Sequence, residues 1–306
     1  MKPERLGLCA LLAVTVVWGT TFPAMKLLSA HLDALQIIWL RFVIALAVLA
    51  PLWWGMRSAE RRWGSALGLL LFIAFWLQIE GLARTSSNRN AFVTGLSVLV
   101  VPLIAMAALG RRYGWQLWAA CAMAFAGMTL MFHENEPWNL GDTLTLASTV
   151  FYAVYILALE ECARRTAAQP MRATRMAAAQ ASMMALAATA LLLAQAGAAD
   201  GSSTGLGGLP SALRQLPASG WVALVYLGLL ASVVVVTLQA WGQQRVDALR
   251  SAIVFGLEPV FAALTAWALL GERLGLAGVG GATLIVAALV FSQLQPAARP
   301  AAAAQA

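Results

Sequence analysis

The chain has 306 residues, of which 61% are hydrophobic and only 11% are charged. A soluble globular protein of this length needs more charge to cover its surface, so the composition excludes that class. The net charge of +7 would suit nucleic-acid binding, but the placement of the basic residues, described below, argues against that partner.

Ten apolar blocks follow one another along the chain. Each is about 20 residues long, the length at which a helix spans a hydrocarbon core of about 30 Å. In chain order the blocks are 6–28, 34–54, 64–84, 90–110, 115–132, 140–160, 173–196, 220–241, 250–270 and 275–294. The first block is too long for a cleaved signal peptide and is expected to remain as a span. We therefore predict an all-α membrane protein of ten transmembrane helices.

Basic residues are distributed unequally between the two sides that this topology defines. With both chain ends in the cytoplasm, 13 lie on the cytoplasmic side, namely Lys2, Arg5, Arg57, Arg61, Arg62, Arg111, Arg112, Arg164, Arg165, Arg172, Arg245, Arg250 and Arg299. The other side carries five, namely Lys26, Arg84, Arg89, Arg214 and Arg273. This positive-inside bias predicts N- and C-termini that are both cytoplasmic, in a bacterial cytoplasmic (inner) membrane. The basic excess then reflects topology, and no nucleic-acid partner is expected.

The chain also repeats itself. An offset of 161 residues aligns 77–114 with 238–275, and sixteen of these 38 positions are identical. Matched Leu or Ala would be expected by chance in this composition, whereas matched Gly, Arg and Gln, such as Gln78 with Gln239, indicate a true repeat.

Earlier in each half the offset is 134, which pairs Arg41 with Arg175. The stretch 197–219 absorbs the difference between the two offsets and is expected to be a long loop. The first five-helix repeat then covers 1–135 and the second covers 136–295. Because five is odd, the second repeat enters the membrane from the opposite side. Inverted repeats are typical of secondary transporters, whose site lies near the midplane between the halves.

Three motifs resemble the drug/metabolite transporter superfamily, EamA type: WGTTFP (18–23), QIEGLARTSSNRNAFVTGLSVLVVP (78–102) and LQAWGQQRVDALRSAIVFGLEPVFAALTAWALLGERL (238–274). The resemblance covers 7–294 and is weakest around 165–219. It implies ten helices with both termini inside, and transport of amino acids, related metabolites or drugs, usually outward. It does not identify the substrate.

Polar and aromatic residues on repeat-related helix faces are the candidates for a substrate cavity. A charge at the centre of a span costs about 2.5–3.5 kcal/mol, so it needs a partner or a water-filled cavity. The candidate substrate-binding residues are Trp18, Thr21, Gln78, Thr94, Ser97, Tyr152, Tyr155, Gln239, Phe255 and Glu258. Gln78 and Gln239 lie towards opposite ends of the proposed pathway and are candidates for its two gates.

Several charged residues have two interpretations. Glu258 contacts substrate or a proton, or else it caps broken helix backbone or pairs with an arginine. Glu80 is expected to reach the membrane interface rather than to couple protons. Arg41 and Arg175 are expected to position their helices at the interface, with anion recognition as the alternative. For the aromatic residues, packing between helices is the alternative to substrate binding.

No cofactor, metal site or catalytic set is predicted, and we do not expect an enzyme. His133, Glu134 and Glu136 share one short loop but lack a fourth metal ligand. The chain contains no P-loop motif, and its two histidines assemble no catalytic triad. The Ala-rich tail 296–306 is expected to be disordered.

These patterns favour a proton- or gradient-coupled exporter of small metabolites such as amino acids, working by alternating access. The alternatives are an uncoupled facilitator and a carrier of sugars or nucleotide sugars. The inverted repeat and the absence of a set of catalytic residues both argue against an intramembrane enzyme or a receptor. The expected partners are a small-molecule substrate (an amino acid, a related metabolite or a drug), the lipid bilayer and protons. The protein is expected to be a monomer or a homodimer.

Overall fold

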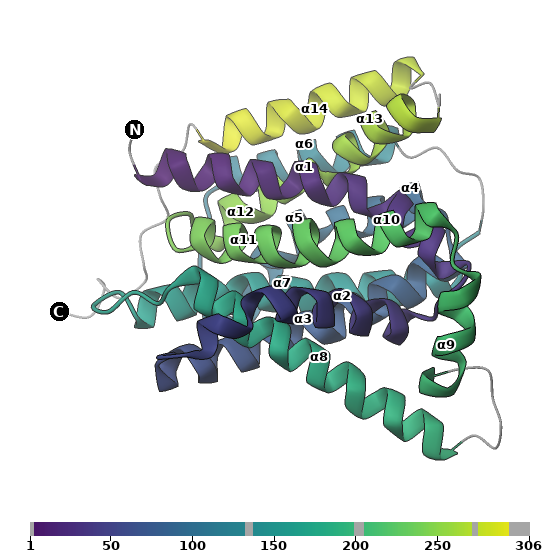
Figure 1. Cartoon of the computed structure of the whole chain (residues 1–306). Helices are drawn as coiled ribbons and strands as arrows, with labels where there is room; N and C mark the ends of the chain where they lie inside the picture. Colours follow the sequence, from purple (N-terminus) through teal and green to yellow (C-terminus); the bar gives the residue numbers. More distant parts are fainter. Residues whose placement is uncertain (1–2, 132–136, 199–204, 271–274, 294–306) are drawn as a thin grey trace.

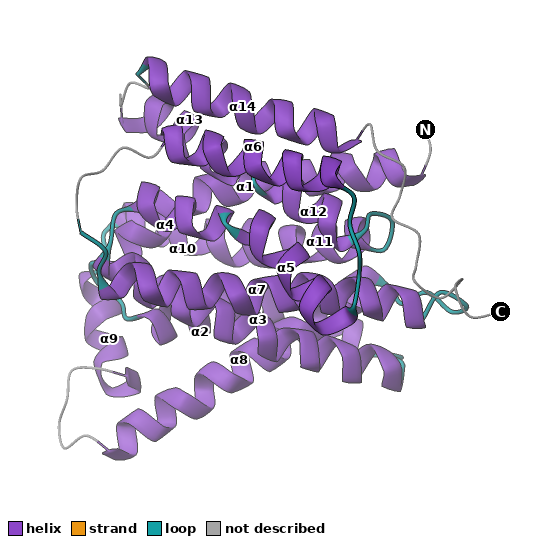
Figure 2. Cartoon of the chain, turned by 180° about the vertical axis from the view of Figure 1, so that it is seen from behind, coloured by secondary structure: helices purple, strands orange, loops and turns teal. Residues whose placement is uncertain are grey.

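The computed structural model describes residues 3–131, 137–198, 205–270 and 275–293. Within these ranges the chain forms helices and connecting loops (Figure 2). Eight helical segments are long and apolar enough to cross a membrane. Two more apolar helices, Trp115–Leu130 and Leu276–Phe291, are shorter.

The helices of the two halves follow in the same order as the predicted blocks. The first half contains α1 (Pro3–Ser29), α2 (Ala34–Leu49), η1 (Ala50–Trp53), α3 (Ser58–Arg84), α4 (Ser87–Gly95), α5 (Ser97–Leu109) and α6 (Trp115–Met131). The second half contains α7 (Leu140–Arg165), α8 (Ala173–Ala198), α9 (Gly205–Gln215), α10 (Ala218–Tyr226), η2 (Leu227–Val234), α11 (Val235–Gln243), α12 (Ala248–Phe255), α13 (Glu258–Leu270) and α14 (Leu276–Gln293). Each predicted apolar block falls on one of these helices or on a segment made of two or three of them.

The long helices pack side by side in one bundle, and α9 lies across one of its ends (Figure 1). Helices α6 and α14 pack together at one edge, and α8 packs against α2 and α3 at the opposite edge. Helix α1 runs between these edges, where it contacts α11, α12 and α13. The beginning of α1 and the end of α14 lie at the same end of the bundle (Figure 1).

The stretch 197–219, predicted to be a loop, contains the helix α9. Leu206, Leu209 and Leu213 recur at helical spacing and turn an apolar face towards the core. The prediction of a continuous loop was wrong because the glycines and Pro210 suggested irregular backbone, whereas burial of the leucine face favours a helix.

Two of the membrane-spanning segments are broken at positions 161 residues apart. Leu96 separates α4 from α5, and the turn that includes Leu257 separates α12 from α13. The residues that begin these segments are also 161 apart. The side chains of Ser86 and Asp247 each accept a hydrogen bond from the backbone N–H three residues on. The sequence repeat thus has a counterpart in the local backbone.

The segment formed by α10, η2 and α11 contains a π-helix, η2. The Ser232 hydroxyl donates to the carbonyl oxygen of Leu227, five residues earlier, at 2.8 Å. A Cβ atom on Gly228 would lie 2.7 Å from Cγ2 of Ile44, so glycine allows α2 to approach this closely. Such π-helices are rare and occur frequently at functional sites.

Candidate functional site

A cavity in the middle of the bundle is lined by side chains from α1, α2, α3, α4, α7 and α13. Its volume is about 30 Å³, which gives room for about two water molecules. The lining residues are Trp18, Thr21, Met25, Arg41, Ala74, Phe75, Gln78, Thr94, Ser148, Tyr152 and Glu258. Six of the ten predicted site residues are among them, namely Trp18, Thr21, Gln78, Thr94, Tyr152 and Glu258.

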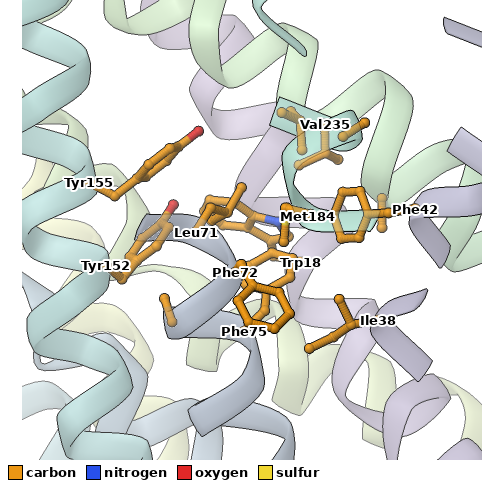
Figure 3. Close-up of a cluster of buried hydrophobic side chains, with 14 of the residues drawn as sticks. Trp18, Ile38, Phe42, Leu71, Phe72, Phe75, Tyr152, Tyr155, Met184 and Val235 are labelled. Atoms are coloured by element: carbon orange, nitrogen blue, oxygen red, sulfur yellow. The ribbon is translucent and has the colours of Figure 1, made fainter. Parts of the chain in front are cut away.

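The aromatic rings of Trp18, Phe75 and Tyr152 line one wall of this cavity, and Figure 3 shows them among the buried side chains of the core. The ring of Trp18 meets Tyr152 edge-on at 5.5 Å between centroids and packs on Phe255 at 5.0 Å. Phe255 therefore supports the wall from behind instead of lining the cavity. Tyr155 stacks on Tyr152 at 5.7 Å, and its hydroxyl donates to Oε1 of Gln180 at 2.8 Å, so it belongs to the packed core.

The two glutamines predicted as gates each contact a cavity residue on another helix. Gln78 lines the cavity and donates from Nε2 to the hydroxyl of Thr94 at 3.1 Å. Gln239 lies behind the wall and donates from Nε2 to the hydroxyl of Tyr152 at 2.8 Å. Ser97 is buried at the start of α5, directly after the helix break, and does not line the cavity.

Two charged side chains, Glu258 and Arg41, line the cavity and are almost completely buried. Their exposed fractions are 6% and 2%. Glu258 is the first residue of α13, at the helix break. Among the residues that the structure describes, neither side chain forms an ion pair with the other or with any other charged group.

The prediction that Arg41 positions α2 at the interface was wrong. It is the eighth of the 16 residues of α2, and its guanidinium lies over the rings of Phe42 and Phe75. A single arginine in the middle of an apolar run was itself the signal of a buried charge.

Four further lining residues were not among the predicted site residues. Ser148 lies one helical turn before Tyr152, so helical spacing does place it on this face, and its hydroxyl donates to the Ala74 carbonyl at 2.7 Å. Met25 and Phe75 are apolar residues in apolar helices. Their sequence context does not distinguish cavity lining from ordinary packing.

The other charged candidates lie away from the cavity. Glu80 pairs with Arg84, whose side chain is 45% exposed, as expected for residues near an interface. Arg175 pairs with Glu60, with its NH1 atom 3.6 Å from the carboxylate. In the described parts of the chain, no group of three or more His, Cys, Asp or Glu side chains is arranged to hold a metal ion.

Two predictions concern residues outside the described ranges. They are the incomplete metal-ligand set of His133, Glu134 and Glu136, and the disordered tail 296–306.

The helices and the cavity together define an integral membrane protein with many spans and a polar, aromatic site between its helices. The model of the EamA-like transporter family matches residues 5–133 and 139–293, so the chain belongs to this family. It is also similar to an uncharacterized transporter of Archaeoglobus fulgidus, with 24% identity over 282 residues that cover 92% of this chain and 84% of that protein.

One solved structure, described only as the crystal structure of a protein, has the same fold. Its TM-score is 0.69 at 21% sequence identity, and the match covers 95% of this chain and 96% of that one. The protein is thus a membrane transporter by family, and these relationships point away from an enzyme.

Proposed function

We propose that the protein is a secondary transporter that exports small metabolites, such as amino acids, by alternating access. The observation that carries this proposal is the cavity between the helices, to which both halves contribute. Trp18 and Thr94 come from the first half, whereas Tyr152 and Glu258 come from the second. Secondary transporters built from repeats place their sites between the halves in this way.

The chemistry of the cavity suits a small amphipathic solute. The rings of Trp18 and Tyr152 offer apolar surface to a side chain. The hydroxyls of Thr21 and Thr94 and the carboxylate of Glu258 offer acceptors for ammonium or hydroxyl groups. A drug-sized ligand needs a pocket of about 300–1,000 Å³ and even an amino acid exceeds two water molecules, so the cavity must widen to bind solute.

At each end of the bundle two helices cross at a pair of glycines. In this proposal the two helix crossings open in turn. At one end α3 and α7 meet at Gly81 and Gly141, where a Cβ on Gly81 would lie 2.7 Å from the Gly141 oxygen. At the other end α1 and α11 meet at Gly7 and Gly242, where a Cβ on Gly7 would lie 3.1 Å from the Gly242 oxygen. These glycine pairs correspond under the two repeat offsets. Alternating access would separate one pair while the other stays closed.

In this proposal the protein lies in the bacterial inner membrane with both termini in the cytoplasm, as a monomer or a homodimer. Glu258 is the acid placed to bind a proton or a solute cation, because it is buried at a helix break beside the cavity. An uncoupled facilitator would need no such acid.

The test is counterflow of labelled amino acids and related metabolites in proteoliposomes, with and without a pH gradient. We expect saturable exchange of one solute class and acceleration by the pH gradient. Glu258→Gln should abolish the acceleration while the protein still elutes as a folded, monodisperse species. Glu80→Gln is the matched control, because this acid lies outside the cavity, and it should behave as the wild type. Full acceleration in Glu258→Gln would refute the coupling role, and absence of exchange across the panel would refute the proposed function.

A further inference from the structure

We propose that Arg41 binds the carboxylate of the transported solute, which makes the substrate class zwitterionic, with a carboxylate and an ammonium group. This inference rests on the proposed function and names the substrate of the same cavity. It is carried by the burial of Arg41, its lack of a counter-ion in the described structure, and its place in the cavity wall.

The hydrogen bonds of Arg41 leave donor capacity unused. Its Nε donates to the Ser232 hydroxyl at 3.3 Å and its NH1 lies 3.6 Å from the sulfur of Met25, both neutral acceptors. A guanidinium carries five N–H donors in a planar fork that matches a carboxylate. The guanidinium also lies 5.1 Å from the centre of the Phe75 ring, which itself lines the cavity. The guanidinium of Arg41 is therefore held beside the cavity, and some of its N–H donors remain available for a further acceptor.

The repeat supplies an internal comparison. Arg175 corresponds to Arg41 at the offset of 134 residues, and it pairs with the buried carboxylate of Glu60 at 3.6 Å. The second-half arginine thus has a protein counter-ion, whereas the first-half arginine has none among the described residues. A buried, uncompensated charge is costly, and a solute carboxylate would compensate it.

The position of Arg41 is set by the π-helix η2. Ser232 satisfies its own hydroxyl within η2 and accepts from Arg41 at the same time. Gly228, one turn earlier in η2, lets α2 approach closely at Ile44. The irregular turn therefore brings a polar acceptor to the guanidinium and fixes its direction. Ser232 is a positioning residue in this scheme, and Arg41 is the binding residue.

The charge balance favours a zwitterion over a simple anion or cation. Arg41 and Glu258 line one cavity without forming an ion pair, so both charges are available to a solute once the cavity has widened. A carboxylate at Arg41 and an ammonium at Glu258 leave the occupied cavity neutral. A phosphate would instead place two negative charges near Glu258, which is unfavourable at low dielectric constant.

The test compares pairs of solutes that differ only in the carboxylate. The pairs are phenylalanine with phenethylamine, leucine with isopentylamine, and threonine with 1-amino-2-propanol. Each member competes against counterflow of a labelled amino acid in proteoliposomes. For the wild type we expect the carboxylate-bearing member of the accepted pair to compete roughly 10- to 100-fold better.

Arg41→Gln should lower the apparent affinity for the amino acid by a similar factor and leave that for the amine within about two-fold. Arg41→Lys should recover part of the preference, because an ammonium keeps the charge but not the bidentate geometry. Arg175→Gln is the matched control and should keep the full preference. Should Arg41→Gln fail to fold, Ser232→Ala tests the same point, since it removes the positioning bond and should reduce the preference several-fold.

Equal losses for both members in Arg41→Gln would show a purely structural arginine and overturn the inference. Wild-type transport of the amines with no preference for the amino acids would also overturn it, while the proposed transport function would stand. Counterflow of a metabolite that lacks a carboxylate, without counterflow of any amino acid, would overturn the inference alone. Absence of counterflow across the whole metabolite panel would overturn the proposed function itself.

Discussion

The buried ion pair between Arg89 and Asp142 ties the start of α4 to the start of α7. Nε of Arg89 lies 2.7 Å from Oδ1 of Asp142, and the two side chains are 5% and 0% exposed. Asp142 also accepts from the hydroxyl of Thr85 and from the backbone N–H of Asn139. Because these groups share one buried network, removing a single partner leaves an uncompensated charge.

We expect Arg89→Gln to lower the free energy of unfolding by about 3–5 kcal/mol, since it strands the Asp142 carboxylate in the interior. Thermal unfolding in detergent, followed by intrinsic tryptophan fluorescence, measures the effect. Arg250→Gln is the control at the repeat-related position. Its partners Glu4 and Asp247 are 47% and 38% exposed, so the loss should be below about 1 kcal/mol.

The double variant Arg89→Gln with Asp142→Asn should recover much of the lost stability, because it removes both charges. Equal losses at the two repeat-related arginines would contradict the argument from burial.

At the scale of single residues, the sequence predicted some of the side chains that line the cavity and misplaced others. Glu258 stood out because it is an acid inside an apolar block followed by proline, and it does line the cavity. Tyr155 lies on the same predicted helix face as Tyr152 but faces Gln180 instead of the cavity. Helical spacing gives the face of a residue, whereas lining a cavity depends on which neighbouring helix leaves space there. That depends on tertiary packing.

The elements that meet at the glycine crossings determine how the cavity can open. Helix α1 is 27 residues and about 40 Å long, and it carries Gly7 near one end. At its other end Lys26 donates to the carbonyl oxygens of Leu82 and Thr85, at the end of α3, close to Gly81. The two crossings therefore lie at opposite ends of the bundle, with the cavity between them.

We expect Gly81→Ala to hold α3 and α7 apart at their shared end. The new Cβ would overlap the Thr145 hydroxyl and lie 2.7 Å from the Gly141 oxygen, and helix backbone cannot shift as a flexible side chain does. In a background without the native cysteines, a Ser148→Cys reporter in the cavity should react several-fold faster with a membrane-impermeant maleimide added from that side. Counterflow should slow.

Gly280→Ala is the control for this experiment, since a Cβ at Gly280 meets nothing within 4 Å. Gly242→Ala should raise labelling from the opposite side instead. Unchanged labelling from both sides in Gly81→Ala would refute a gate at this crossing.

The sequence located most helices but not their internal irregularities. Block length and apolar content were sufficient for α1, α3 and α7. The break near Leu96 was not predicted, and the one near Leu257 entered only as the alternative in which Glu258 caps broken helix backbone, although Gly95, Gly256 and Pro259 stand beside them. Glycine and proline are common within membrane helices, so they do not by themselves distinguish a break from a packing contact.

At the scale of the whole molecule, the predicted topology places most of the basic residues that flank the spans on one side of the membrane. With 13 basic residues on that side against five on the other, we expect both termini in the cytoplasm. The beginning of α1 and the end of α14 lie at one end of the bundle, which is compatible with this expectation (Figure 1).

Reporter fusions test this orientation. A green fluorescent protein fused at either terminus should fluoresce, and an alkaline phosphatase fused at the same points should be inactive. A reporter inserted between α8 and α9 should show the opposite pattern. Active phosphatase at the C-terminus would overturn the predicted topology.

For the whole molecule, the family and the class of transporter could be predicted from motifs that extend over most of the chain. The family match confirms both predictions. The substrate did not follow, because the motifs lie in the shared scaffold. Selectivity depends on single side chains such as Arg41, whose surroundings come from helices far apart in the sequence. The connection between α8 and α10 was predicted, but its helix α9 was missed, since it belongs to the region of weakest resemblance.

The small volume of the cavity has a consequence for the energy balance of the cell. A space for about two water molecules, with apolar rings along one wall, is much shorter than the roughly 30 Å of hydrocarbon that a chain of hydrogen-bonded waters would have to cross. We therefore expect this conformation to conduct neither protons nor small ions. A cell can therefore hold many idle copies in its membrane without dissipating the gradient on which its other transporters depend.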